Sequence, residues 1–497
     1  MPRDYTAVTV TFIAYLALML AIGWFAWRRT RDLADYILGG RRLGRWVAAL
    51  SAGASDMSGW LLLGLPGFAY AAGLEAGWLA LGLLVGTWAN WRWIARPLRA
   101  YTEAAGNALT LPAFFAQRCG GRGAAVRVVA ALVILLFFAI YTASGLVAGG
   151  KLFQTVFGIP YGAAVLAGAA AVLLYTLFGG FLAVSWTDVV QALLMAAALA
   201  VVPAMAWFAT GGAMLGAIEA RGAGLLNPLT DADGQPLSLI AVASLLAWGL
   251  GYFGQPHILA RFMAISSPDQ VPRARRIAVG WTALTLLGAT LVGLSGIAYL
   301  AEPLHGAGTE RVFMLLTTAL FHPVIAGILL AAILAAIMST ADSQLLVSSS
   351  ALAEDFYRAL LRRQASQGEL VAVQRGAVLA VALVATVLAM DPDSRVLALV
   401  AYAWAGFGAA FGPVVILALF WERLNASGAL AAMLSGGVTV LVWGRLEGGW
   451  FDLYELVPGF VAAMAAGVVG SLATAPVAAD IRQRHRALRQ RLSAGPR

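Results

Sequence analysis

The sequence has little charge and almost no cysteine. Of its 497 residues, only 11% are Asp, Glu, Lys or Arg, and Cys119 is the single cysteine. One cysteine excludes an intrachain disulfide and argues against a metal site built from thiolates. The chain also lacks the Gly-x-x-x-x-Gly-Lys-Ser/Thr pattern of a phosphate-binding loop. This absence argues against a pump driven directly by ATP.

What the chain has instead is apolar sequence. It is 61% hydrophobic, with a mean hydropathy of +0.82. A soluble domain cannot hide that much apolar surface, so we expect an all-α membrane protein with 13 transmembrane helices. The expected spans are Val8–Trp27, Val47–Tyr70, Gly77–Ile94, Arg127–Phe153, Tyr161–Phe178, Val189–Thr210, Leu237–Gln255, Ile277–Leu300, Pro323–Ser350, Val371–Met390, Val396–Trp421, Ser427–Trp443 and Leu453–Thr474.

Basic residues are divided unevenly between the two sides that this arrangement defines. Most of the 33 Lys and Arg residues, Arg261 among them, fall in one set of loops and in the C-terminal tail. Cytoplasmic loops of membrane proteins carry such an excess. We therefore expect the N-terminus outside and the C-terminus inside. The basic surplus then faces membrane lipid, and nucleic acid is not an expected partner.

Two of the expected spans are interrupted by helix-breaking residues. The second is broken at Ser55–Gly59, and the seventh, five spans later, at Trp248–His257. Paired broken spans are typical of inverted repeats whose broken helices form a binding site at the bilayer midplane. Five spans per repeat would invert the second copy relative to the first.

These breaks define the expected organisation of one transmembrane transporter domain, residues 1–497. The short loops leave no room for a soluble catalytic domain, so we expect no enzyme. The expected segments are an extra first span with its loop (1–45), a first repeat (46–211), a second repeat (237–421), two extra spans (422–474) and a basic cytoplasmic tail (475–497).

Asp56 lies in the interruption of the second span. A carboxylate at bilayer depth costs roughly 2.5 to 3.5 kcal/mol on insertion scales, so a functional role is the first interpretation. Carbonyls freed by the break, together with a negative charge, attract a small hard cation such as Na⁺. The alternative is a capping carboxylate that accepts hydrogen bonds from amides where the helix restarts.

Further polar residues lie in the ninth span and directly before the sixth. Ala336, Ser339 and Thr340 are spaced i, i+3 and i+4, so they share one helical face. Hydroxyls more often bond to their own helix, but beside the Asp56 break they predict an ion site. Asp188, followed three residues later by Gln191, fits a capping box or an ion contact on the exit path.

Aromatic residues at expected mid-depth indicate a compact apolar solute with a polar end. They are Tyr141, beside small polar residues, and Trp248 with Tyr252, one helical turn apart. His257, next to Pro256, suggests either proton coupling or a structural role. Its expected place beside a basic cytoplasmic loop favours the structural role.

Five runs of sequence resemble the solute:sodium symporter family, and within it the bacterial sodium/proline symporters. They are Tyr36–Arg41, Ala49–Trp60, Phe181–Asp188, Gly249–Met263 and Ala401–Pro413. The resemblance covers almost the whole chain. It implies a 13-span protein with the five-plus-five inverted repeat of leucine-transporter-like proteins.

The resemblance also implies two sets of binding residues. The sodium site would use the carbonyls of Ala54, Met57 and Ala336 and the hydroxyls of Ser339 and Thr340, with Asp56 and Asp188 ion-linked. Recognition of L-proline would use Ser58, Tyr141, Trp248, Tyr252 and Pro256. The proline carboxylate would lie near the amides of Ser58 and Gly59, at the start of a half-helix. Asp342 is an extra carboxylate after the sodium hydroxyls, which leaves open a further ion contact at the exit.

The expected function is therefore sodium-driven uptake of L-proline by alternating access in a bacterial inner membrane. Na⁺ is the coupling ion, and no obligate protein partner is expected. Symport of another small solute, such as a carboxylate, a sugar or another amino acid, is an alternative. A non-transporting membrane sensor is a third, which the lack of an output domain disfavours.

Overall fold

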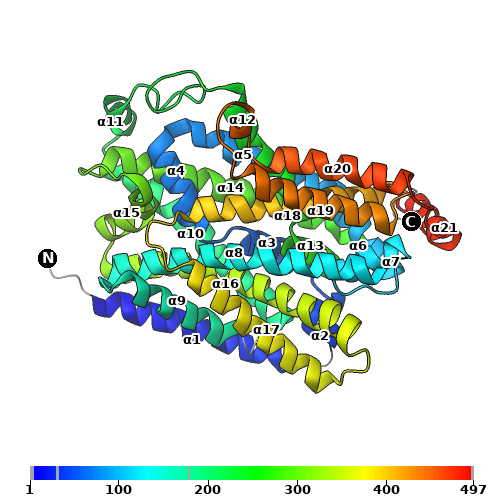
Figure 1. Ribbon diagram of the computed structural model, residues 1–497. Helices are drawn as coiled ribbons and strands as arrows, with labels where there is room; N and C mark the ends of the chain where they lie inside the picture. The colour runs from blue at the N-terminus through cyan, green and yellow to red at the C-terminus, as the bar shows by residue number, and fades with distance from the viewer. Residues whose placement is uncertain (1–4, 30–32, 122, 177–179, 494–497) are drawn as a thin grey trace.

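The computed structural model describes residues 5–29, 33–121, 123–176 and 180–493, and these residues are helical almost throughout (Figure 1). Within them the only β-bridges are isolated ones, Leu43 with Ile265 and Thr230 with Pro236. The α-helices are α1 (Tyr5–Trp27), α2 (Leu33–Leu38), α3 (Arg45–Asp56), α4 (Leu65–Ala72), α5 (Ala76–Ala89), α6 (Ala95–Ala104), α7 (Leu111–Cys119), α8 (Gly123–Phe157), α9 (Tyr161–Thr176), α10 (Phe181–Ala209), α11 (Met214–Arg221), α12 (Leu239–Ala247), α13 (Pro256–Ala264), α14 (Val271–Tyr299), α15 (Val312–Leu320), α16 (Pro323–Ser350), α17 (Gln367–Leu388), α18 (Val396–Phe420), α19 (Ala426–Trp443), α20 (Leu456–Leu472) and α21 (Ala479–Ser493).

Shorter helical turns, of 3-10 or π type, connect or extend these helices. They are η1 (Gly39–Arg41), η2 (Trp60–Gly64), η3 (Gly73–Glu75), η4 (Asn90–Ile94), η5 (Trp248–Gly254), η6 (Pro268–Gln270), η7 (Gly306–Arg311), η8 (Ala351–Leu361) and η9 (Gly449–Asp452). One of them, η5, lies at the second interruption that the sequence predicted, and η2 directly follows the first.

Many of the described helices are long and apolar enough to cross a membrane. By length and composition nine qualify, or ten when the bent pair Leu239–Gly254 and Pro256–Ala264 is taken as one span. Two further apolar helices, Tyr161–Leu173 and Leu456–Leu472, are shorter. The chain is thus a polytopic, all-helical membrane protein.

Each expected span overlaps a helix, but several limits differ. The sixth span was expected from Val189, whereas α10 begins at Phe181. The seventh was expected to end at Gln255, whereas a second half-helix, α13, continues to Ala264. Phe178, the expected end of the fifth span, lies outside the described residues, as do residues 1–4 and 494–497 of the two terminal segments.

Two helices form the interior of the bundle, α16 and α18. The most apolar stretch of Pro323–Leu361 is 83% buried, and that of Val396–Phe420 is 89% buried. The corresponding stretch of α1 is only 28% buried. The ribbon shows α1 and α17 along one side and α20 along the other, with α8 and α18 between them (Figure 1). A helix at the centre of the bundle can carry polar side chains away from lipid, and α16 carries the predicted ion-binding face.

An ion pair joins three segments at one end of the bundle. Lys151 Nζ, near the end of α8, lies 2.5 Å from Glu310 Oε2 in η7, and both residues are buried. The Glu310 carboxylate also accepts hydrogen bonds from the amides of Val396 and Leu397, each at 3.1 Å. A carboxylate at a helix N-terminus satisfies free amides and complements the helix dipole, so Glu310 fixes the start of α18.

The basic C-terminal segment is a helix that packs against α6. In α21, the Arg486 guanidinium forms two hydrogen bonds, of 2.6 and 2.8 Å, with the Glu422 carboxylate. His485 Nδ1 lies 2.8 Å from the Tyr101 hydroxyl of α6. The described part of the tail is therefore docked on the body of the protein.

Candidate functional site

The break in the second span frees backbone carbonyls next to α16. Helix α3 ends at Asp56 because Met57 has non-helical torsions, φ −82° and ψ 74°. The Ser58 amide, which would bond to the Ala54 carbonyl in a continuous helix, bonds instead to the Asp56 carbonyl at 3.0 Å. Ala54 O is thus left without its helical donor. A buried carbonyl must find another partner.

Hydroxyls of α16 supply that partner. Ser339 Oγ donates to Ala54 O at 2.8 Å, and Thr340 Oγ1 lies 3.4 Å from the same oxygen. Ser339 Oγ also lies 3.1 Å from Ala336 O on its own helix. The structure therefore brings four of the five predicted sodium ligands together. Among the described residues no hydrogen bond joins the fifth, Met57, to this group.

The chemistry of this group suits a hard monovalent cation. All four atoms are neutral oxygens, two carbonyls and two hydroxyls, and the hydroxyl hydrogens can rotate away when an ion binds. Within the described residues there is no cluster of three or more His, Cys, Asp or Glu side chains that could hold a metal. The geometry thus matches Na⁺ rather than a transition metal.

Asp56 is buried beside this group and faces a different set of helices. Its Oδ2 accepts a 2.6 Å hydrogen bond from the Tyr252 hydroxyl, and its Oδ1 has no partner. Its carbonyl oxygen accepts from the Tyr141 hydroxyl at 3.2 Å and from Trp60 Nε1 at 3.3 Å. The side chain does not reach Ser339 or Thr340 by any hydrogen bond in the described structure.

The predicted aromatic residues lie on both sides of the break in α3. Trp248 stacks on Tyr454, with ring centroids 5.5 Å apart, and lies 6.4 Å from Trp60. Tyr252 packs edge-on against Trp404 at 4.9 Å. These contacts give the break an apolar, aromatic wall next to freed backbone groups.

Ser58 and Gly59 occupy different environments within the break. The Ser58 hydroxyl is buried next to Tyr141 and has no partner of good hydrogen-bond geometry among the described residues. At Gly59 an added Cβ would lie 2.6 Å from the Ala148 Cβ of α8. Gly59 therefore permits a close approach of two helices.

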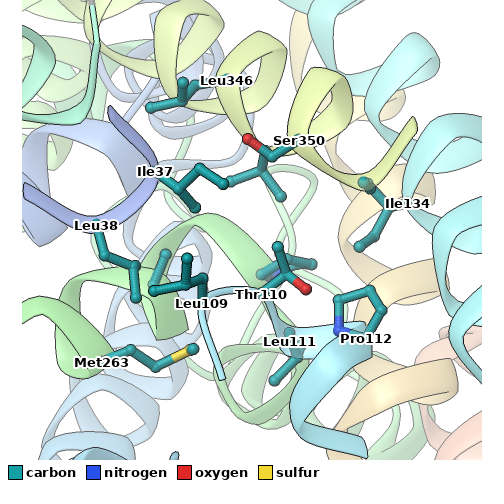
Figure 2. A pocket seen from close by; sticks show the side chains of 14 residues that line it. Ile37, Leu38, Leu109, Thr110, Leu111, Pro112, Ile134, Met263, Leu346 and Ser350 are labelled. Carbon is teal, nitrogen blue, oxygen red and sulfur yellow. The ribbon is translucent and has the colours of Figure 1, made fainter. Parts of the chain in front are cut away.

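Pro256 does not belong to the aromatic wall. It is the first residue of α13 and lines a separate, small cavity. Side chains from α2, α7, α8 and α16 also line this cavity, among them Leu38, Pro112, Ile134 and Ser350 (Figure 2). The lining is almost entirely apolar.

His257 also differs from the expectation. It was expected beside a basic cytoplasmic loop, but it lies in the first turn of α13 and is fully buried. Its ring packs edge-on against Phe138 at 5.5 Å and Tyr141 at 5.9 Å, and neither ring nitrogen has a hydrogen-bond partner.

Asp188 is the centre of a buried network that the sequence did not predict. The capping-box interpretation is wrong, because α10 begins seven residues earlier and Asp188 lies within the helix. Its Oδ2 accepts hydrogen bonds from Ser51 at 2.6 Å and Ser55 at 3.1 Å, and it lies 3.2 Å from Arg261 Nη2. The network connects α10 to both broken spans.

Arg261 was assigned to a cytoplasmic loop, and this assignment is also wrong. It is fully buried in α13, where it donates to Ser343 Oγ at 2.5 Å and to the His257 carbonyl at 3.0 Å. Ser343 Oγ in turn lies 2.8 Å from Ser339 O. Pro256 at the start of a mostly apolar run, Pro256–Ala264, was the sequence signal that could have placed Arg261 in a second half-helix.

Asp342 lies deep in the bundle, on the side of α16 that faces α9. Its Oδ1 accepts a 2.5 Å hydrogen bond from Thr176 Oγ1, and its Oδ2 has no partner.

Comparison with known proteins agrees with this architecture. The family model described as the sodium:solute symporter family matches residues 36–436. The chain is 53% identical to the sodium/proline symporter of Salmonella typhimurium over 482 residues, which is 95% of each chain. It is 53% identical to the sodium/proline symporter of Escherichia coli, over 94% of this chain and 93% of that one. It is 51% identical to the high-affinity proline transporter of Bacillus subtilis, over 90% of this chain and 94% of that one.

Solved structures share the fold at much lower identity. A Na⁺-coupled sialic acid symporter in a substrate-bound, outward-open state matches with a TM-score of 0.78 at 20% identity, over 95% of this chain and 99% of that one. A nucleobase-cation-symport-1 family transporter in a closed conformation matches with a TM-score of 0.54 at 13% identity, over 92% of this chain and all of the other. Together with the family model and the relatives of Salmonella and Escherichia, the broken helices identify this chain as a member of the sodium:solute symporter family.

Proposed function

We propose that this protein is a sodium-driven symporter of L-proline in the bacterial inner membrane. The observation that carries the proposal is the group of oxygens that Ser339, Thr340 and Ala336 of α16 form with Ala54 O. Relatives about 50% identical over nearly the whole chain are named sodium/proline symporter or high-affinity proline transporter. Na⁺ is the coupling ion, and L-proline is the solute.

In this proposal Na⁺ binds between the break of the second span and α16. The carbonyls of Ala54, Met57 and Ala336 and the hydroxyls of Ser339 and Thr340 are its ligands. The ion replaces the hydroxyl-to-carbonyl hydrogen bonds and holds α3 to α16. Asp188 acts on the ion indirectly, because Ser343 links its network to the Ser339 carbonyl.

L-Proline binds on the other face of the same break. Its carboxylate lies near the amide of Gly59 and the hydroxyl of Ser58, where a half-helix N-terminus favours an anion. Its ring packs on Trp248 and Tyr141, while Tyr252 holds Asp56 in place. Because both solutes touch one segment, binding of either favours the other, and the coupling is reciprocal.

Pro256 has a separate role in this proposal. It contacts proline during release, because it lines the apolar cavity of Figure 2 rather than the aromatic wall. Leu38, from the segment before the second span, and Pro112, from the segment after the third span, line the same cavity. The cavity is therefore part of the proposed cytoplasmic path.

The proposed topology has 13 spans in a five-plus-five inverted repeat, with the N-terminus outside and the C-terminus inside. Its support is the pair of broken helices, α3 to α4 and α12 to α13, five spans apart. The start of α1 and the helix α21 lie at opposite ends of the bundle, as an odd number of spans requires (Figure 1). Residues 46–211 and 237–421 are the two repeats.

The sodium gradient supplies enough free energy for this function. One Na⁺ moving through about 100 mV releases about 2.3 kcal/mol. A roughly tenfold concentration gradient adds about 1.4 kcal/mol. With one ion per solute, the sum supports a few hundredfold accumulation of a zwitterion.

Uptake by proteoliposomes tests the proposal. Labelled L-proline should accumulate when Na⁺ is high outside, and a potassium gradient of equal size should give no accumulation. Unlabelled sugars, carboxylates and other amino acids should compete poorly. Sodium-driven uptake of another solute that proline does not inhibit would overturn the proline assignment. Sodium-dependent proline binding without flux would indicate a sensor instead.

A further inference from the structure

Two cavities share a wall near the proposed cytoplasmic end of the bundle. The first is the small apolar cavity of Figure 2. The second is larger, about 510 Å³, and several charged side chains line it, Arg127 and Glu354 among them. Leu109 and Thr110 line both cavities. The loop before α7, residues 105–110, therefore forms one side of the wall between them.

The end of α16 forms the other side of this wall. Ser350, the last residue of α16, lines the small cavity, whereas Glu354 and Arg358 of η8 line the larger one. Ser350 is only 3% exposed. The Arg358 side chain is 44% exposed, so the larger cavity reaches solvent. A solute that moves from the small cavity to the larger one therefore passes between η8 and the loop before α7.

One carboxylate joins η8 to that loop. Asp355 Oδ1 accepts a hydrogen bond from the Thr110 hydroxyl at 3.0 Å and another from Arg127 Nε, near the start of α8, at 2.8 Å. Arg127 Nη2 lies 2.7 Å from the same oxygen. Among the described residues, no other side-chain hydrogen bond connects η8 to the loop before α7. Asp355 is therefore the polar link that closes the wall.

The closed link leaves the Asp355 carboxylate incompletely satisfied. Asp355 is fully buried, and its Oδ2 has no hydrogen-bond partner among the described residues. An unsatisfied buried acceptor destabilises the arrangement that buries it. Opening the link lets water reach this oxygen, which offsets part of the loss of the hydrogen bonds to Thr110 and Arg127. The closed arrangement is thus able to open.

The segment η8 also connects this link to the proposed sodium site. It continues α16, the helix that carries Ser339 and Thr340. Its hydrogen bonds are of the π type, and π-helical turns are rare and frequent at functional sites. A shift of α16 on loss of the ion is therefore transmitted to Asp355 along one helix.

We propose that Asp355 is the latch of the cytoplasmic gate, and that breaking its hydrogen bonds with Thr110 and Arg127 joins the two cavities so that the solute can leave. Asp355 positions η8 against the loop before α7 and does not touch the solute. The inference rests on the proposed function, which makes the small cavity part of the cytoplasmic path.

Labelling of a cysteine in the small cavity tests the latch. Ser350→Cys places a thiol there, and a charged methanethiosulfonate reagent is added to inside-out membrane vesicles without proline. Labelling should be slow in Ser350→Cys alone. It should be about tenfold faster when Asp355→Asn is added, because a hydrogen bond between two charged groups is lost. Arg127→Gln should also speed labelling, because it leaves the buried carboxylate without its cation.

The natural cysteine reports folding in the same proteins. Cys119 is buried and lines neither cavity, so it should stay unlabelled in every folded variant. If it becomes labelled in Asp355→Asn or in Arg127→Gln, the other variant decides the result. Labelling of Cys119 in both variants would show that the pair holds the fold and not a gate, and would overturn the proposal.

Glu369→Gln is the matched control. Glu369 accepts a 2.5 Å hydrogen bond from the Tyr357 hydroxyl of η8, so it joins η8 to α17 and not to the loop before α7. This variant should label at the rate of Ser350→Cys alone. If Asp355→Asn and Arg127→Gln also label at that rate, Asp355 is not a latch. A wild type that shows no sodium-driven proline uptake, with labelling as expected, would overturn the proposed function but not the gate.

Discussion

Ser339 Oγ lies 2.8 Å from the carbonyl oxygen of Ala54, a residue 285 positions earlier in the chain. This contact crosses from the second expected span to the ninth. It exists because the Ser58 amide has turned away to the Asp56 carbonyl. A local break in one helix thus creates an acceptor that a distant helix satisfies, and a cation can replace that bond.

The first prediction concerns the hydroxyls of α16. The double variant Ser339→Ala, Thr340→Ala removes two oxygens from the proposed sodium site. Its sodium concentration for half-maximal proline uptake should rise by at least tenfold, since each hydrogen bond to a charged group is worth about 1.5 to 3 kcal/mol. The selectivity for proline should stay the same. Ser349→Ala is the control, because that hydroxyl bonds only to Leu346 O on its own helix. If the sodium dependence of uptake is unchanged, the hydroxyls of Ser339 and Thr340 are not sodium ligands.

The second prediction concerns Trp248, which is 7% exposed and stacks on Tyr454. Trp248→Ala should raise the proline concentration for half-maximal uptake by about tenfold or more, because burying an aromatic contact is worth at least 1.5 kcal/mol. The sodium requirement should change much less. The proline concentration for half-maximal uptake by Trp248→Phe should lie between those of the wild type and Trp248→Ala. Trp88→Ala, on an exposed face of α5, is the control. Proline affinity equal to the wild type would exclude Trp248 from the pocket.

The two breaks were predictable from sequence because their causes are local. Small and helix-breaking residues cluster at Ser55–Gly59, and the run of glycines before Pro256 interrupts the seventh span. The face shared by Ser339 and Thr340 follows from helical periodicity alone.

The buried network could not be predicted in the same way. Asp188 and Arg261 are 73 residues apart, and only tertiary packing brings them together. Hydropathy favoured a loop for Arg261 because α13 is short and begins with a proline. Sequence thus revealed where the backbone breaks, and packing decided which side chains meet there.

The third prediction concerns the ion pair of Asp188 and Arg261, whose side chains are both fully buried. Asp188→Asn leaves the guanidinium without a carboxylate, and removing one partner of a buried pair costs about 3 to 5 kcal/mol. Thermal unfolding in detergent should show a lower apparent Tm. The double variant Asp188→Asn, Arg261→Met should have an apparent Tm between those of Asp188→Asn and the wild type.

A surface pair provides the control for this experiment. Asp269 lies 3.5 Å from Arg96, and its side chain is 62% exposed. Asp269→Asn should change stability by less than about 1 kcal/mol. If the two Asp→Asn variants unfold at the same temperature, the buried network does not stabilise the junction of α3, α10 and α13.

The C-terminal helix offers a pH-dependent contact outside the membrane. Burial, reinforced by the charges of Arg118 and Arg489, lowers the pKa of His485 to about 4. The neutral imidazole contacts the Tyr101 hydroxyl. Since the pKa of a free histidine is about 6.5, docking favours the neutral form. Its contribution is complete above about pH 6.5 and is lost as the pH falls toward 4.

The fourth prediction is therefore that acidification loosens the packing of α21 around His485. The Glu422–Arg486 pair should persist in this range, because its hydrogen bond with Arg486 lowers the pKa of Glu422 to about 2. A spin label at Ala487→Cys should gain mobility between about pH 6.5 and 4. The buried Cys119 should not compete for the label. His485→Gln removes the titrating group, so its label should show no such transition. A transition that persists in His485→Gln would assign the effect to another group, and the absence of any transition in the parent protein would show that neutral His485 does not hold the tail.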